Sequence, residues 1–230
     1  MSLTTYDLSD GIATITMADG KVNALSPEML GAISADLDRA KEEAEADAVI
    51  LTGSATTFSA GFDLRTEAER WPEMLIAGAS LAEQLMTHPK PTVAACNGNA
   101  LAMAAFLLLS ADLRIGIEGE FKIGLNEVRI GLTVPYFGIA IARHRLTRPY
   151  FDRCTATGVV LDPEEARTAG FLDRLVAPDE LEAAARAAAA DLKNVKHPAH
   201  PATKVRIREE AVAGIRDGID RIRNRDQAEW

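Results

Sequence analysis

Apolar residues along the chain repeat with two periods, one typical of strands and the other typical of helices. Alternation over 4–8 and 11–17 predicts a β-hairpin, and continuous apolar runs at 48–53 and 91–98 predict buried strands. Further strands are expected at 113–118 and 172–176. Helices are expected over 27–45, 64–88, 102–111, 162–170 and 179–195. Because strands and helices alternate, the sequence predicts an α/β fold with a mostly parallel sheet covered by helices.

Local signals mark where some of these helices begin or break. Ser26, Pro27 and Glu28 supply an N-cap, a first-turn proline and an early acid to the helix over 27–45. Pro72 lies inside the helix expected over 64–88 and can break it.

The stretch 196–204 contains two prolines and little periodicity, so a boundary is predicted there. This divides the chain into a core over 1–195 and a C-terminal helical segment over 196–230. The segment carries six apolar residues near helical spacing: Val205, Ile207, Val212, Ile215, Ile219 and Ile222. A terminal helix with such an apolar stripe packs on its own domain or on a partner subunit.

Composition narrows the class of partner. The 230 residues are 47% hydrophobic, enough to bury one sizeable core. A net charge of -9 and a pI near 5.0 argue against nucleic acid or an anionic membrane as the partner. The longest apolar run, 100–109, is shorter than the roughly 18 residues of a membrane span.

Location and metal binding can also be predicted from the sequence. The first residues have neither the basic nor the apolar region of a signal peptide, so a cytoplasmic location is expected. Cys96 and Cys154 have no metal-ligand spacing and are predicted to be reduced packing residues. No metal site is expected.

Small residues follow two of the predicted strands and can expose backbone N–H groups. Ser59, Ala60 and Gly61 let the chain turn sharply and leave the N–H of Phe62 free to donate. After the next strand, a helix is expected to start near Ala102 or Met103, and its first N–H groups have no partner within the helix. The two loops can therefore each offer one N–H group to a single oxygen.

A lone acid, Glu127, lies between a glycine turn and an apolar stretch in FKIGLNEVRIGLTVP. Taken alone, such an acid is either a surface or capping charge or a carboxylate held in a dry pocket to move protons. The neighbouring motifs decide between these interpretations.

Three motifs, FSAGFDL, NGNALAMAAFLLLSADLRI and IGLNEVRIGLTVP, together resemble the crotonase family of enoyl-CoA hydratases and isomerases. The resemblance covers nearly the whole chain. It implies a spiral of ββα units, a trimer or hexamer, and an acyl-CoA thioester substrate whose carbonyl oxygen sits between two backbone amides. It implies no cofactor beyond the coenzyme A moiety of the substrate.

The resemblance also implies roles for individual residues. The two amide donors fall on the N–H groups of Phe62 and Met103. Coenzyme A contacts fall on the segments 21–25 and 60–65, with these residues implied: Lys21, Ala24, Ala60, Phe62, Asp63, Leu64 and Arg65. Lys21 and Arg65 are the candidates for the phosphate groups. Capping of the following helix is the competing role for Asp63.

Departures from the family pattern favour one reaction over another. Family hydratases have glycines where this chain has 102–104, and a glutamate where it has Phe106. Glu127 matches the other family glutamate, within a motif closer to the isomerases. One base is enough to lift a proton and return it nearby, so the resemblance favours an isomerase with Glu127 as the base.

Leu125, Phe106 and Leu132 are expected to surround Glu127 and to raise its pKa. The alternatives are a hydratase that works with one carboxylate and a non-catalytic acyl-CoA binding protein.

Overall fold

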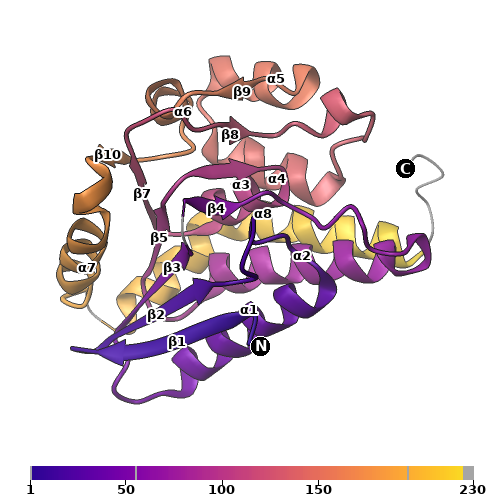
Figure 1. Ribbon diagram of the computed structural model, residues 1–230. Helices are drawn as coiled ribbons and strands as arrows, with labels where there is room; N and C mark the ends of the chain where they lie inside the picture. Colours follow the sequence, from indigo (N-terminus) through magenta and orange to yellow (C-terminus); the bar gives the residue numbers. More distant parts are fainter. Residues whose placement is uncertain (1, 55, 196, 225–230) are drawn as a thin grey trace.

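A computed structural model describes residues 2–54, 56–195 and 197–224, which form two sheets surrounded by helices (Figure 1). The strands are β1 Thr4–Ser9, β2 Ile12–Met17, β3 Ala48–Gly53, β4 Thr57–Ser59, β5 Thr92–Cys96, β6 Asn99–Leu101, β7 Leu113–Ile117, β8 Ile123–Gly124, β9 Val160–Leu161 and β10 Arg174–Val176. The longer helices are α1 Pro27–Glu42, α2 Trp71–Thr87, α3 Met103–Ser110, α4 Tyr136–Arg145, α5 Arg148–Thr157, α6 Pro163–Ala169, α7 Leu181–Leu192 and α8 Ala199–Arg223. Short 3-10 helices are η1 Ala68–Arg70, η2 Glu127–Ile130 and η3 Pro178–Glu180.

The larger sheet contains all the strands predicted from the sequence. Its order is β1-β2-β3-β5-β7-β10, with β1 and β2 antiparallel and the remaining neighbours parallel. The register pairs Thr4 with Met17 and Ser9 with Ile12, which confirms the predicted hairpin. The mostly parallel α/β sheet is likewise confirmed.

A second, four-stranded sheet in the order β4-β6-β8-β9 was not predicted as strands. These strands have two or three residues each, too few for a period to show in the sequence. They complete the repeat of the fold: β3-β4-α2, β5-β6-α3 and β7-β8-α4 each place one strand in each sheet before a helix. This arrangement is the predicted spiral of ββα units.

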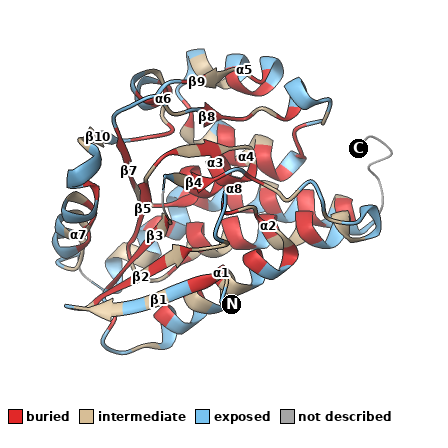
Figure 2. Ribbon diagram, in the orientation of Figure 1, coloured by how far each residue is buried: buried red, intermediate tan, exposed pale blue. Residues whose placement is uncertain are grey.

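The central strands β3, β5 and β7 of the larger sheet consist almost entirely of buried residues, and they are red in Figure 2. On one face α7 packs against β3, β5 and β7, with Ile50, Val93 and Ala185 in the shared apolar cluster. On the other face α1, α2 and α3 contribute to a larger core. Since alternate residues of a strand point to opposite faces, a continuous apolar strand is what this double burial requires.

Three predicted helix boundaries are wrong, one of them the end of the helix expected over 179–195, which lies at Leu192. The helix expected over 64–88 begins at Trp71, and residues 64–70 form turns and η1 instead. Pro72 therefore lies in the first turn and does not break the helix, because the N–H group that proline lacks would have no partner there. The helix expected over 27–45 ends at Glu42.

The helix α8 begins at Ala199, within the stretch that was predicted to be irregular. Pro201 is tolerated because it lies in the first turn. The apolar stripe is only partly correct: Val205 and Ile207 are 49% and 65% exposed, while the four more distal members pack on α2 and α4. The part of the predicted helix over 225–230 lies outside the described residues. Among the described helices, none combines the length and apolarity that crossing a membrane would need.

Candidate active site

A mainly apolar cavity of about 140 Å³ lies where the two predicted loops meet the segment that carries Glu127. Its walls come from the β4–α2 connection, the start of α2, the N-terminus of α3 and the segment from η2 to the start of α4. The lining residues are Ala60, Phe62, Leu64, Trp71, Leu75, Ala102, Asn126, Glu127, Ile130, Leu132, Thr133 and Pro135. Among them, Glu127 alone has an ionisable side chain.

Glu127 is the first residue of η2, which follows β8. Its carbonyl oxygen accepts a hydrogen bond from the Leu132 N–H at 2.9 Å, so the chain folds back over the acid. The residue is 6% exposed, and its Oε2 atom has no hydrogen-bond partner among the described residues. Burial raises the pKa of Glu127 to about 7. A carboxyl group with this pKa can both accept and donate a proton near neutral pH.

The N–H group of Phe62 faces away from the neighbouring chain because of the hydrogen bonds on either side of it. Leu25 N–H donates to the Gly61 carbonyl at 2.8 Å, and Asp63 N–H donates to the Leu25 carbonyl at 3.3 Å. In a parallel bridge of this kind, the residue between the two bonded groups directs its own N–H outward. The Phe62 N–H has no acceptor in the described parts of the chain.

The second predicted donor, the N–H of Met103, opens α3. The Ala102 carbonyl accepts from the N–H groups of Ala105 and Phe106, whereas the N–H of Met103 has no acceptor within the described ranges. Unpaired N–H groups at a helix start attract a partial negative charge.

The two loops lie against each other. A Cβ atom placed on Gly61 would lie 2.6 Å from the carbonyl oxygen of Leu101 and 3.1 Å from the Cβ of Ala102. One placed on Gly78 of α2 would lie 2.7 Å from the Phe62 ring and 3.1 Å from the Met103 Sδ. The structure therefore brings both predicted donors and Glu127 to one region, as the sequence motifs indicated.

Phe106 occupies the position of the missing second acid, but its side chain belongs to the core. It is fully buried and packs edge-to-face on Phe137, with the ring centroids 6.0 Å apart. Neither Phe106 nor Leu125 lines the cavity, so of the three expected apolar neighbours only Leu132 does. The sequence placed Phe106 correctly on α3 but could not show that α4 closes over its ring.

The segments predicted to contact coenzyme A run side by side. Ala60 N–H donates to the Val22 carbonyl at 3.0 Å, next to the Leu25 bridge described above. Asp19, which was not predicted, shapes the first segment by accepting from the N–H groups of Lys21 at 2.8 Å and Ala24 at 3.0 Å. Lys21 and Ala24 do not line the cavity, whereas Ala60 and Leu64 do.

Asp63 does not cap a helix, which corrects that expectation. Its carboxylate accepts two hydrogen bonds of 2.8 Å from the Arg65 guanidinium and one of 3.0 Å from the Arg65 N–H. The hydrogen bonds from Arg65 lower the pKa of Asp63. The Arg65 side chain is 72% exposed while it holds this ion pair.

Two polar residues of the cavity, Asn126 and Thr133, were missed by the sequence analysis. The Oδ1 atom of Asn126 is buried without a partner among the described residues, next to Glu127 in the chain. Its position beside the predicted base was the available signal. In the part of the chain that the structure describes, no three His, Cys, Asp or Glu side chains come together as metal ligands.

Comparisons with known proteins agree with this geometry. Residues 7–214 match the family model described as enoyl-CoA hydratase/isomerase. A curated relative from Thermus thermophilus, named a putative enoyl-CoA hydratase, is 33% identical over 177 residues, which is 74% of this chain and 69% of the relative.

Solved structures of similar proteins have the same fold. An enoyl-CoA hydratase/isomerase family protein from Pseudomonas syringae superposes with a TM-score of 0.93 at 43% identity, covering 96% of this chain and 97% of that one. An apo enoyl-CoA isomerase from Mycobacterium tuberculosis gives 0.93 at 40% identity, covering 97% and 98%. The relatives thus carry names of both hydratases and isomerases.

Proposed function

Because the chain belongs to the enoyl-CoA hydratase/isomerase family, which acts on acyl-CoA thioesters, we propose that it shifts the double bond of a 3-enoyl-CoA to the 2-position. One observation carries this choice: Glu127 is the single ionisable side chain among the residues that line the cavity. Adding water across a double bond benefits from two carboxylates that orient the water, whereas moving a proton between two carbons needs one base.

In this mechanism the thioester carbonyl oxygen lies between the N–H groups of Phe62 and Met103. Each donor stabilises the charge that develops on that oxygen by about 3 kcal/mol in the transition state. The Glu127 carboxylate removes a proton from C2, and the electrons of that C–H bond pass into a dienolate. The protonated Glu127 then returns the proton to C4, the double bond forms between C2 and C3, and the carboxylate is regenerated.

The coenzyme A moiety would lie along the segments 21–25 and 60–65, with Lys21 and Arg65 toward its phosphate groups. Both cations are exposed beside the cavity loops, which supports this assignment. The reaction requires no cofactor other than this moiety. A homotrimer or hexamer in the cytoplasm belongs to the same proposal.

Parallel incubation with a 3-enoyl-CoA and a 2-enoyl-CoA tests the reaction. We expect the 3-enoyl substrate to be converted to the conjugated 2-enoyl product and the 2-enoyl substrate to gain no water. Glu127→Gln should lower kcat by about 10³-fold or more, because proton transfer by a placed base contributes about 10²–10⁴-fold. Glu120→Gln, an exposed acid of the preceding loop, should leave turnover unchanged.

Two results would replace the proposal. Hydration of the 2-enoyl substrate without isomerisation would favour a hydratase working with one carboxylate. Tight acyl-CoA binding without turnover on either substrate, unchanged by Glu127→Ala, would favour a non-catalytic binding protein.

A further inference from the structure

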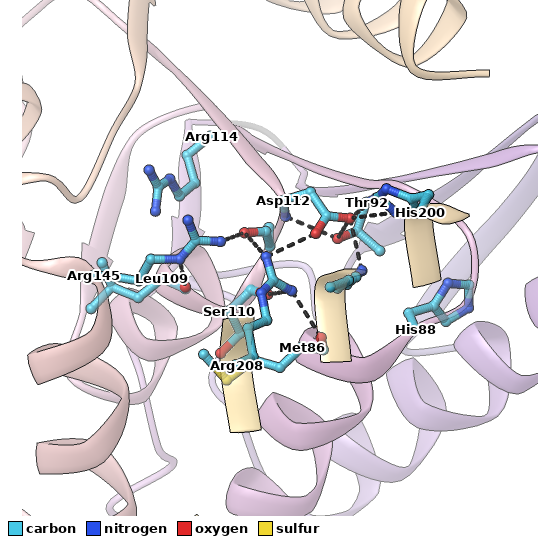
Figure 3. Close-up of polar contacts among 12 residues, drawn as sticks. Met86, His88, Thr92, Leu109, Ser110, Asp112, Arg114, Arg145, His200 and Arg208 are labelled. Atoms are coloured by element: carbon cyan, nitrogen blue, oxygen red, sulfur yellow. Dashed lines mark hydrogen bonds and ion pairs between the residues drawn. The ribbon is translucent and has the colours of Figure 1, made fainter. Parts of the chain in front are cut away.

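Beneath the N-terminal half of α8 lies a cluster of buried and half-buried charged side chains, part of which Figure 3 shows. The cations are Arg114 of β7, Arg145 at the end of α4, and Lys204 and Arg208 of α8. In the described part of the chain, the carboxylates within ion-pair distance of these cations are Asp112 and Asp173. Neither this cluster nor the cavity beside it shares a residue with the candidate active site.

Both carboxylates already have cationic partners. Asp112 lies 2.7 Å from the Lys204 ammonium and 2.8 Å from the Arg208 guanidinium, and it also accepts from the Thr92 N–H at 2.8 Å. Asp173 accepts hydrogen bonds from the side chain and the backbone N–H of Arg114. Each acid is therefore already paired with at least one cation of the cluster.

Arg145 has no carboxylate partner among the described residues. Its guanidinium donates to the carbonyl oxygens of Leu109, at 2.9 Å, and Ala111, which satisfies hydrogen bonds but leaves the charge unpaired. Arg208 is 3% exposed, and its Nε atom has no partner within the described ranges. Arg145 is half-buried, and a cation that is partly withdrawn from water without a counter-ion is costly, so this site favours an anion from outside.

The nearby histidines do not add to the positive charge at neutral pH. Burial lowers the pKa of His144 to about 4 and lowers that of His200 below its usual value. Burial also lowers the pKa of Lys204 to about 8 and that of Arg145 to about 9, which still leaves both charged at pH 7. The four cations and two carboxylates therefore leave an excess of two positive charges.

A cavity of about 580 Å³ opens onto this cluster. Arg145, Lys204 and Arg208 line it together with the carboxylate Asp112, so its charged wall holds three cations and one anion. Asn194 and Thr203 add uncharged polar groups. Ile207, which is 65% exposed, also lines it. The cavity therefore combines a wall of net positive charge with access from solvent.

We propose that this cavity binds a small dianionic oxyanion, either inorganic phosphate or the phosphate of a monoester. Two unbalanced cations match a dianion better than a halide, and the Nη1 atom of Arg145, which takes no part in the hydrogen bonds to Leu109 and Ala111, can donate to a phosphate oxygen. Because its wall comes from α4 and α8, the bound anion would hold α8 in place. The site would act on stability and not on the reaction.

Thermal unfolding in sodium phosphate, compared with sodium chloride at the same pH and ionic strength, tests the proposal. A ligand of the folded state at ten times its Kd should raise the Tm by about 3–5 °C for a chain of this size. Phenyl phosphate distinguishes the two sources: an equal rise indicates that the site accepts monoesters, and no rise restricts it to the free ion.

Variants separate site binding from the general stabilisation that phosphate gives to any folded protein. Arg145→Gln should abolish the phosphate-specific rise, whereas the exposed Arg167→Gln on α6 should keep it. Ile207→Glu changes an exposed side chain and so preserves the fold. It should raise the Tm without phosphate and reduce the response, since its carboxylate supplies the missing charge.

An equal phosphate response in all four proteins would overturn the proposal, because it would reflect a general salt effect. A wild-type Tm that is the same in phosphate and in chloride but rises with protein concentration would also overturn it. In that case an acidic side chain of a second copy would occupy the cavity.

Discussion

Glu127 is a carboxyl group whose surroundings set the pH at which it ionises. An exposed glutamate ionises near pH 4.5, but burial in the apolar cavity raises the pKa of Glu127 to about 7. Glu127 is held in the cavity by the short 3-10 helix η2, which no regular apolar period in the sequence predicts. The chemistry of this residue is therefore a property of its site.

The pH dependence of turnover follows from this pKa. Since the base must be ionised to take the C2 proton, kcat/KM should level off above about pH 8 and fall about tenfold per pH unit below about pH 6. Steady-state assays of the 3-enoyl-CoA reaction across this range would measure it. A profile that is flat from about pH 4 to about pH 8 would remove Glu127 from the role of base.

The same pKa makes a prediction for stability. Because the folded state binds the proton more tightly than the unfolded state, Glu127 stabilises the protein at pH values below its unfolded pKa. That contribution is lost as the pH rises through about 7. Glu127→Gln, which cannot ionise, should therefore have a free energy of unfolding up to about 3 kcal/mol higher than that of wild type at pH 8.

Urea titrations of both proteins at pH 5 and pH 8 would check this, with Glu120→Gln as the control that shifts at neither pH. If the advantage of Glu127→Gln were the same at both pH values, packing and not ionisation would be its cause.

At the scale of the element, α3 begins with a strained residue. Ala102, its N-cap, has φ +50° and ψ -121°, a region that favours glycine. This conformation turns the chain from β6 into α3, whose first residue is Met103. Strain of this kind costs about 1–3 kcal/mol and persists where the surrounding structure imposes it.

Ala102→Gly should stabilise the protein by up to about 2 kcal/mol, because the strain removed exceeds the extra unfolded-state entropy of glycine, about 0.4–1 kcal/mol. Ala105→Gly, the same change at a regular position of α3, should instead destabilise it by about 1 kcal/mol or more. Chemical denaturation of both variants measures the contrast. Equal destabilisation by the two substitutions would show that Ala102 is not strained.

At the scale of the whole molecule, α8 closes the core by close approach to α4 (Figure 1). A Cβ atom on Gly218 would lie 2.7 Å from the backbone nitrogen of Phe137 and 3.0 Å from its Cβ. Real Cβ contacts are not this short, so only glycine allows the two helices to pack at this distance. The ring of Phe137 in turn packs on Phe106 beneath the candidate active site.

Gly218→Ala should therefore destabilise the protein by about 1–3 kcal/mol, the usual range for overpacking. Gly31→Ala is the matched control in α1, where an added Cβ meets nothing within 4 Å, and it should stabilise by about 0.5–1 kcal/mol. Thermal and chemical unfolding would measure both. Gain of stability in both variants would contradict the close packing of α8 on α4.

Most of the larger sheet and the place of the site could be predicted from local pattern. The buried strands stand out because each is apolar along its whole length, and the small residues at 59–61 mark one loop of the site. The four short strands could not be predicted, because two or three residues carry no period. The start of α2 was predicted at 64 because residues 64–70 have a composition typical of a helix. In the structure the Asp63–Arg65 ion pair and the turns keep these residues out of the helix, which begins at Trp71.

The amino-acid sequence by itself determined the α/β class and the alternation of strand and helix, and its motifs, through the family that they resemble, indicated residues for two N–H donors and one base. The class and the alternation depend on nearby residues, whose period and backbone preferences act locally. Only the tertiary structure decided that Glu127 is buried with a raised pKa, that Phe106 lies in the core, and that four cations gather under α8. Burial and unbalanced charge arise between segments far apart in the chain, so no local pattern contains them.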